Sequence, residues 1–245
     1  MSVVGLIGGS GAALYPAASK IQAHNAKTLW GQPSAPVKCW TQQGHELCFL
    51  SRHGENHVIP PHRINYRANI QALADMGVDF IIAMNAVGGI AKSAKPGVLV
   101  IPDQLIDYTW GRFHTYFDSH KDKVNFTDFT RPYDGKLSKL LVNAAHTEKL
   151  PVVAGGTYAV TQGPRLETAA EIDRLERDGC TIVGMTAMPE AALASELSLP
   201  YISCSSVVNY AAGRSDAAIH SEIEAFLKLG VQHSAQLINR FLQDL

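Results

Sequence analysis

Five short stretches of this chain join glycines to arginine, histidine, hydroxyl or amide side chains, directly after or between apolar segments. They are residues 7–11 (IGGSG), 51–57 (SRHGENH), 85–89 (NAVGG), 163–168 (GPRLET) and 184–190 (GMTAMPE). In α/β folds, turns of this kind at the carboxyl ends of strands bind ligands through backbone N–H groups and short polar side chains. Together the five stretches predict a site that holds anions and hydrogen-bonding groups.

The glycine-rich turn at residues 7–11 is open to three interpretations. A dinucleotide fingerprint would need a glycine at position 14, after Gly9 and Gly11, where the chain has Leu14, and no G-K-[ST] of a P-loop follows. A bare tight turn remains possible. The third interpretation is a loop that binds phosphate or a similar anion, with the Ser10 hydroxyl as an extra donor.

The second stretch offers an arginine beside histidines. The guanidinium of Arg52 suits a phosphate because its donors form a rigid fork, and His53 could share that anion. The alternatives are a polar surface turn and a metal site made by His53, His57 and His62, which no zinc-type spacing supports. In the fourth stretch, Glu167 could simply stabilise the start of a helix. The sequence has no G-x-S-x-G, no H-E-x-x-H and no other nucleophile–base pair that predicts a covalent intermediate.

Composition narrows the function further. The 245 residues carry a formal net charge of -1 and no basic run, which argues against nucleic-acid binding. No apolar stretch has the length of a membrane helix, and the first residues do not resemble a signal peptide. The four cysteines, Cys39, Cys48, Cys180 and Cys204, lack C-x-x-C spacing and histidine neighbours, so we expect free thiols in a cytoplasmic protein without a metal.

These stretches must be positioned by alternating strands and helices. Apolar runs predict strands at residues 3–7, 46–51, 79–85, 98–101, 152–161, 181–185 and 201–208, and helical periodicity predicts helices at 63–76, 166–177, 188–197 and 221–242. We expect the last helix to break or bend near Gly230. Residues 110–132, rich in aromatic and polar side chains, predict a long functional or interface loop. The pattern is typical of a single α/β domain.

The combined motifs, in this order along nearly the whole chain, resemble those of the trimeric purine nucleoside phosphorylase and methylthioadenosine phosphorylase family. The quoted stretches SRHGENHVIPPHRINYRANI, PGVLVIPDQLIDYT and TQGPRLETAAE carry the resemblance. It implies a single domain over residues 1–245, with a mixed, twisted and partly barrel-like sheet flanked by helices. It also implies transfer of a pentosyl group from a purine to inorganic phosphate, with no cofactor or metal, by a homotrimer.

The same resemblance implies roles for individual residues. The phosphate site would comprise Ser10, Arg52, His53, Asn85, Ala86 and Thr186, and the nucleoside site would comprise Met185, Glu167, Asn209, Tyr210, Ala211 and Ile223. Among these, Asn209, Arg52 and His53 would act directly in catalysis. The aromatic loop would help to close the sugar pocket of a neighbouring chain, with His114 or Phe117 as contacts.

The residues at the base differ from those of family members that take 6-aminopurines. Those members have aspartate where this chain has Asn209, and usually again at Ala211. An asparagine can present its NH2 group to O6 or N7, and Glu167 can accept from the N1–H of a 6-oxopurine. Methylthioadenosine phosphorylases typically have a small hydroxyl residue at Glu167. The two residues therefore favour hypoxanthine or guanine.

The sugar end favours a different branch. Residues 51–70 resemble the methylthioadenosine phosphorylases, and Ile223 falls where an apolar residue accepts the methylthio group. A shift of a few residues would instead place His220 near a 5′-hydroxyl. We therefore expect S-methyl-5′-thioinosine as the substrate, with inosine or methylthioadenosine phosphorolysis as alternatives. A non-catalytic nucleoside-binding protein is the alternative from another class; Ser10, Arg52, His53 and Thr186 argue against it.

Overall fold

The computed structural model describes residues 1–9, 21–118 and 125–245. Its strands are β1 (Val3–Gly8), β2 (Gln22–His24), β3 (Val37–Gln42), β4 (His45–Ser51), β5 (Phe80–Gly89), β6 (Leu99–Ile101), β7 (Gln104–Asp107), β8 (Val152–Ala154), β9 (Thr157–Val160), β10 (Cys180–Gly184) and β11 (Tyr201–Tyr210). Its helices are α1 (Tyr66–Asp75), α2 (Gly135–Thr147), α3 (Ala169–Arg177), α4 (Ala187–Glu196) and α5 (Ile219–Asp244), with a 3-10 turn η2 at Pro61–Arg63.

The strands of the described residues form one mixed sheet that branches. One path runs β2-β3-β4-β1-β5-β10-β9-β7, while β11 also pairs with β5 and leads to β6 and β8. At the centre of the sheet, β1 is parallel to both β4 and β5, and β11 is parallel to β5. In contrast, β10 is antiparallel to β5. The expected mixed α/β fold is confirmed, and the branch brings the ends of several strands to one place.

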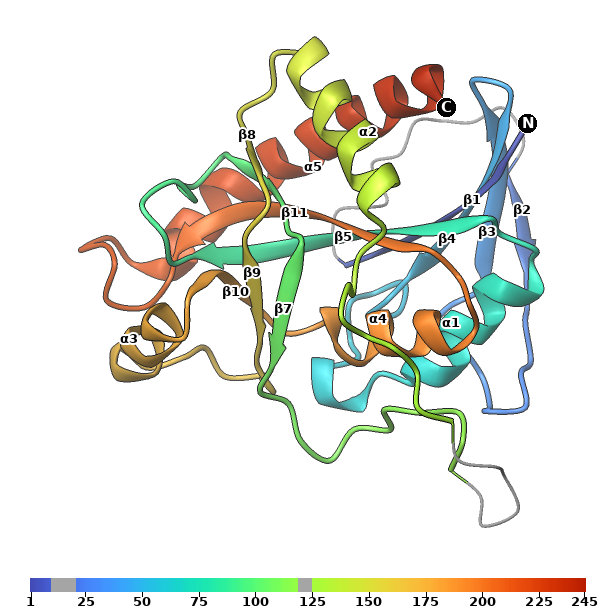
Figure 1. Ribbon diagram of the computed structural model, residues 1–245, viewed down its shortest axis with the longest axis horizontal. Helices are drawn as coiled ribbons and strands as arrows, with labels where there is room; N and C mark the ends of the chain where they lie inside the picture. Colours follow the sequence, from blue (N-terminus) through green and yellow to red (C-terminus); the bar gives the residue numbers. More distant parts are fainter. Residues whose placement is uncertain (10–20, 119–124) are drawn as a thin grey trace.

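Helices cover both faces of the sheet (Figure 1). On one face, α1 and α4 contribute Ile70, Leu73 and Leu193 to an apolar core. On the other, α2 and α5 contribute Leu141 and Phe241 to a second core. Because both faces are buried, the central strands are continuous apolar runs, and this explains why those strands were predictable from the sequence.

Two predicted strand boundaries are wrong. The run predicted as one strand at 152–161 is two strands, because Gly155 and Gly156 adopt positive φ and the chain turns between β8 and β9. Strand β5 continues through the NAVGG stretch to Gly89 instead of ending at Asn85. The glycines of that stretch therefore lie within a strand, where they allow close approach of neighbouring backbone and side chains.

Helix α5 is continuous, so the break predicted near Gly230 is wrong. A Cβ at Gly230 would lie 2.8 Å from the Cβ of Ser206 on β11. The Ser206 hydroxyl also donates to the Gly230 carbonyl at 3.1 Å. Gly230 therefore permits contact between helix and sheet, at the usual cost in helix propensity.

Some elements had no usable signal in the sequence. Helix α2 and strands β2, β3 and β7 were not predicted, because they are short, exposed along one side, or contain mixed polar residues. The predicted irregular loop is confirmed for its described residues. No helix among the described residues is both long and apolar enough to cross a membrane.

Candidate active site

A cavity of about 500 Å³ lies where β4, β5, β10 and β11 end, and α5 forms one of its walls. Ten of the residues predicted for the site line it: Arg52, His53, Asn85, Ala86, Glu167, Met185, Thr186, Asn209, Ala211 and Ile223. Tyr210 is not among the lining residues, and Ser10 lies outside the described residues, next to Gly9, which lines the cavity. Stretches far apart in the sequence thus meet in one concave space, as a ligand site requires.

Arg52 lies beneath the cavity in a buried ion pair. The Arg52 guanidinium donates from Nε and NH2 to the two carboxylate oxygens of Glu190, the latter bond being 2.9 Å long. Its NH1 also donates to the Met84 carbonyl at 3.1 Å, and NH2 to the Ile7 carbonyl at 3.4 Å. The Tyr201 hydroxyl donates to Glu190 at 3.0 Å. The charge of the arginine is therefore balanced from below, and its fork is held rigid.

His53 is held in one neutral form. Burial, together with the positive charge of Arg52, lowers the pKa of His53 to about 4. Its Nδ1 lies 2.8 Å from the Ile59 carbonyl, which can only accept, so Nδ1 carries the proton. Nε2 is therefore unprotonated and can accept a hydrogen bond. It lies beside the glycine turn, because a Cβ at Gly9 would be 3.8 Å from it.

Asn85 and Thr186 form a polar bridge between β5 and the start of α4. The Thr186 hydroxyl donates to Asn85 Oδ1 at 3.1 Å, and Asn85 Nδ2 donates to Ser203 Oγ at 2.9 Å. Each of the three side chains is buried. Chains of satisfied hydrogen bonds fix the orientation of their members, so the bridge presents Thr186 to the cavity in a set position.

Asn209 is buried at the end of β11, and its amide orientation is fixed. Its Nδ2 donates to the Tyr210 carbonyl at 2.7 Å. A flipped amide would place two acceptors together, so this bond assigns nitrogen and oxygen. A Cβ at Gly88 would lie 3.3 Å from Nδ2, so the strand glycine leaves room for the carboxamide. The second N–H and Oδ1 remain available to a ligand.

Glu167 lies in the loop before α3, and not in the first turn of a helix as predicted. Thr168 is the N-cap of α3 and forms a capping box with Glu171, so Glu171, not Glu167, is the acidic residue of that turn. The Thr161 hydroxyl donates to Glu167 Oε1 at 2.6 Å. This bond fixes the carboxylate at the cavity wall and leaves Oε2 able to accept from a ligand.

The wall formed by α5 is mainly apolar, and Ser234 is its polar lining residue. Ile219, Ile223, Leu227 and Val231 recur every fourth residue on one side of the helix and line the cavity. His220 is exposed and is not among the lining residues. The structure therefore does not bring His220 to the cavity.

Arg112 was missed by sequence reasoning, although it connects both sides of the site. Its guanidinium donates to the carbonyls of Met185, Met188, Thr161 and Gln162 at 2.6–3.2 Å. These carbonyls belong to the two segments that carry Thr186 and Glu167. Burial lowers the pKa of Arg112. No local motif marks this residue, because its partners lie about 50 and 75 positions away.

The histidines of the second stretch do not gather as a three-ligand site. His53 and His57 line the cavity with ring centroids 4.5 Å apart, but His62 does not line it. Within the described residues, the one group of metal-ligating side chains found close together is elsewhere and contains no histidine. His53 and His57 instead border the glycine turn at Gly9.

Comparisons with known proteins agree with this geometry. The model of the phosphorylase superfamily matches residues 3–243. The chain is 49% identical over 212 residues, 86% of this chain and 85% of the relative, to a probable S-methyl-5′-thioinosine phosphorylase of Xanthomonas campestris pv. campestris. It is 43% identical over 244 residues to a 6-oxopurine nucleoside phosphorylase of Pyrococcus furiosus, covering 97% and 91% of the two chains.

Solved structures agree in fold. A methylthioadenosine phosphorylase of Schistosoma mansoni in complex with adenine superimposes with a TM-score of 0.90 at 30% identity, covering 99% of this chain and 91% of that one. The family model, the relatives and the fold thus agree with a ligand site at the ends of the strands. This protein belongs to the phosphorylase superfamily and is an enzyme of the nucleoside phosphorylase class.

Proposed function

We propose that the enzyme cleaves S-methyl-5′-thioinosine with inorganic phosphate, giving hypoxanthine and 5-methylthioribose 1-phosphate. The observation that carries this proposal is the composition of the cavity at the strand ends. Asn209 and Glu167 offer a carboxamide and a carboxylate, while Ile223 belongs to an apolar wall in the same space. Naming of the Xanthomonas relative as a probable phosphorylase of this nucleoside supports it.

The phosphate would lie between Arg52, His53 and Thr186. Since Nε2 of His53 is an acceptor, it suits a phosphate that still carries a proton, and that P–OH would donate to it. The glycine turn, with Ser10, would add donors. One phosphate oxygen would form a bond to C1′ as the bond from C1′ to N9 breaks, with positive charge developing on the sugar. Holding the anion in line with C1′ is the main catalytic contribution.

The purine leaves with negative charge, which hydrogen bonds stabilise. The free N–H of Asn209 would donate to N7 or O6, and Oε2 of Glu167 would accept from N1–H. Adenine presents an amine at position 6 and no hydrogen on N1, so a contact to O6 and the contact from N1–H would be mispaired, whereas a contact to N7 would be kept. A buried mismatch of this kind discriminates strongly between substrates.

Two other activities of the same enzyme class remain alternatives. A 6-oxopurine nucleoside phosphorylase would share Asn209 and Glu167, and the Pyrococcus furiosus relative supports it. The apolar side chains of Ile219, Ile223 and Leu227 argue against it, because a 5′-hydroxyl beside them would find no partner. A methylthioadenosine phosphorylase would share the wall but not the base contacts.

We also propose that residues 1–245 work as one domain in a cytoplasmic homotrimer, without a cofactor or catalytic metal. Exposed aromatic side chains support an interface: Trp110, Phe113, Phe117 and Phe126 are 40–91% exposed on the long loop. His114 and Phe117 of this loop are the proposed contacts at a neighbour's sugar pocket. The oligomer can be measured by sedimentation.

The experiment is a phosphate-dependence assay. The purified protein is incubated with S-methyl-5′-thioinosine, with and without phosphate, and the products are resolved by chromatography. Hypoxanthine and a pentose 1-phosphate in equal amounts, only when phosphate is present, are the expected result. Tight nucleoside binding without turnover would instead favour a non-catalytic binding protein.

A further inference from the structure

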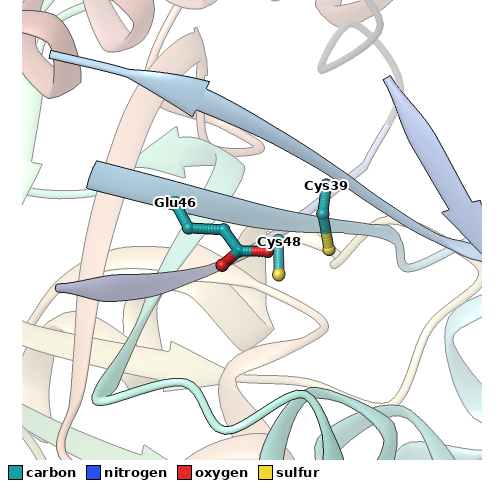
Figure 2. A group of neighbouring side chains, drawn as sticks. All are labelled: Cys39, Glu46 and Cys48. Carbon is teal, nitrogen blue, oxygen red and sulfur yellow. The ribbon is translucent and has the colours of Figure 1, made fainter. Parts of the chain in front are cut away.

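Two cysteines and a glutamate from adjacent strands converge away from the cavity. Cys39 on β3 lies directly opposite Cys48 on β4, and Glu46 lies two residues before Cys48 on the same face of the strand. Their ligand atoms all lie within 4.8 Å of one another. Figure 2 shows the carboxylate and both sulfur atoms pointing into a common space.

This group has donors suited to zinc. Thiolate and carboxylate ligands bind Zn²⁺ at about 2.3 Å and about 2.0–2.2 Å, respectively, in a tetrahedral arrangement. Such bond lengths place two ligating sulfurs about 3.8 Å apart. The observed grouping of Cys39, Cys48 and Glu46 is compatible with that spacing without moving either strand.

The charges of the group also favour a cation. No basic side chain of the described residues forms an ion pair with Glu46, although the carboxylate is half-buried beside two buried sulfurs.

Uptake of a divalent ion would leave the net charge of the group unchanged. With two neutral thiols and one carboxylate the group carries one negative charge. With two thiolates, the carboxylate and Zn²⁺ it carries the same charge, because two protons leave as one ion enters. Binding therefore adds three ligand bonds without burying further net charge.

We propose that Cys39, Glu46 and Cys48 form a zinc site, with a solvent molecule as the fourth ligand. The site fastens β3 to β4, the strand that leads directly into Arg52 and His53. It takes no part in the phosphorolysis proposed above. A disulfide between the two cysteines would use the same sulfurs, but it would leave the Glu46 carboxylate without a partner.

The test is zinc binding by the full-length protein after reduction and chelation. Wild type is expected to take up one Zn²⁺ per chain in competition with a chromophoric chelator, and Co²⁺ in its place should give thiolate-to-cobalt charge-transfer absorption. Cys39→Ser should abolish that absorption, and Glu46→Gln, which alters only a half-exposed residue, should weaken zinc affinity by roughly tenfold or more. Cys180→Ser is the control, because it replaces a buried cysteine outside the group. It should bind zinc as wild type does.

Three results would overturn the proposal. The first is no zinc uptake by the reduced wild type. The second is uptake that Cys39→Ser and Glu46→Gln leave unchanged, which would place the ion elsewhere. The third is a Cys39–Cys48 disulfide, found by peptide mapping of the protein as purified, that persists under reducing conditions with excess zinc. Zinc should also raise the Tm of wild type and not that of Cys39→Ser, because only an ion that binds the folded state stabilises it.

Discussion

Arg52 and Glu190 form a two-pronged ion pair in which neither side chain has appreciable contact with solvent. The pair joins the end of β4 to helix α4, and it carries the arginine to the floor of the cavity. In the proposed phosphate site, an arginine balanced in this way would act as a rigid donor more than as a free positive charge. Its carboxylate partner is thus as much a part of the site as the arginine.

Breaking this pair should cost more than removing it. Arg52→Met and Glu190→Leu should each lower the free energy of unfolding by about 3–5 kcal/mol, because each leaves a buried charge unpaired. The double variant Arg52→Met/Glu190→Leu should lose much less than the sum of the single losses. Urea denaturation of all four proteins measures this, and additive losses would show that the two residues act independently.

The base contact can be tested at Glu167. Glu167→Gln replaces an acceptor facing N1–H with a group that can also donate, so kcat/KM for S-methyl-5′-thioinosine should fall by roughly 10²-fold. Turnover of methylthioadenosine should change little, because adenine has no hydrogen on N1. Thr161→Val, which removes the bond that holds Glu167, should cause a smaller loss in the same direction. Equal losses on both nucleosides would contradict a contact specific to 6-oxopurines.

The sugar contact can be tested at Ile223. Ile223→Thr keeps the branched shape but places a hydroxyl in the apolar wall. The preference for S-methyl-5′-thioinosine over inosine, as a ratio of kcat/KM values, should fall by roughly tenfold or more. His220→Ala serves as the control, because His220 does not line the cavity. If that variant shifts the ratio and Ile223→Thr does not, the helix has been misassigned.

The lowered pKa of His53 predicts a pH dependence of stability. Its pKa falls from 6.5 to about 4 on folding, so the unfolded state binds more protons between these pH values. Stability should therefore decrease as the pH falls from about 6.5 to about 4, and level off below that range for this residue. His53→Gln should flatten the decrease in the free energy of unfolding measured by urea titration over that range. An unchanged slope would mean that His53 is protonated in the folded protein.

Arg112 should act by positioning, since it contacts backbone and not the predicted ligand groups. Arg112→Lys keeps the charge but loses the fork, so kcat should fall by roughly 10²-fold with a smaller change in KM. Added guanidinium should partly restore kcat in Arg112→Ala. Arg67→Lys is the matched control, because Arg67 bonds Thr115 and Asp118 of the same loop but none of the carbonyls that Arg112 bonds. If the variants have a lower Tm but an unchanged kcat per folded enzyme, Arg112 has a structural role only.

Much of the site was predictable because each residue follows an apolar strand. Arg52, Asn85 and Thr186 stand at or near the carboxyl ends of runs that read clearly as buried strands. The convergence of Arg52 and Asn85 follows from the parallel arrangement of β4, β1 and β5. Thr186 follows β10, which is antiparallel to β5, so its position could not be predicted in this way. The roles of Asn209 and Ile223, in contrast, came from resemblance and not from pattern.

The unpredicted parts depend on contacts between distant segments. Glu190 reads as an ordinary residue of a first helical turn, yet its carboxylate is fully buried against Arg52, which lies 138 positions earlier. Cys39 and Cys48 have no motif spacing, because their proximity comes from strand register. A local sequence pattern describes the neighbours of a residue along the chain. It contains little information about a partner on a distant strand or helix.

The most direct measurement is kcat/KM for base release with phosphate from four nucleosides: S-methyl-5′-thioinosine, methylthioadenosine, inosine and adenosine. The four nucleosides differ only at the base and at the 5′ position. The comparison therefore tests the base contacts and the apolar wall separately. We predict that S-methyl-5′-thioinosine is cleaved with the highest kcat/KM by roughly 10²-fold. Faster cleavage of methylthioadenosine would contradict the assignment of Asn209 and Glu167, and inosine at or above S-methyl-5′-thioinosine would contradict that of Ile223.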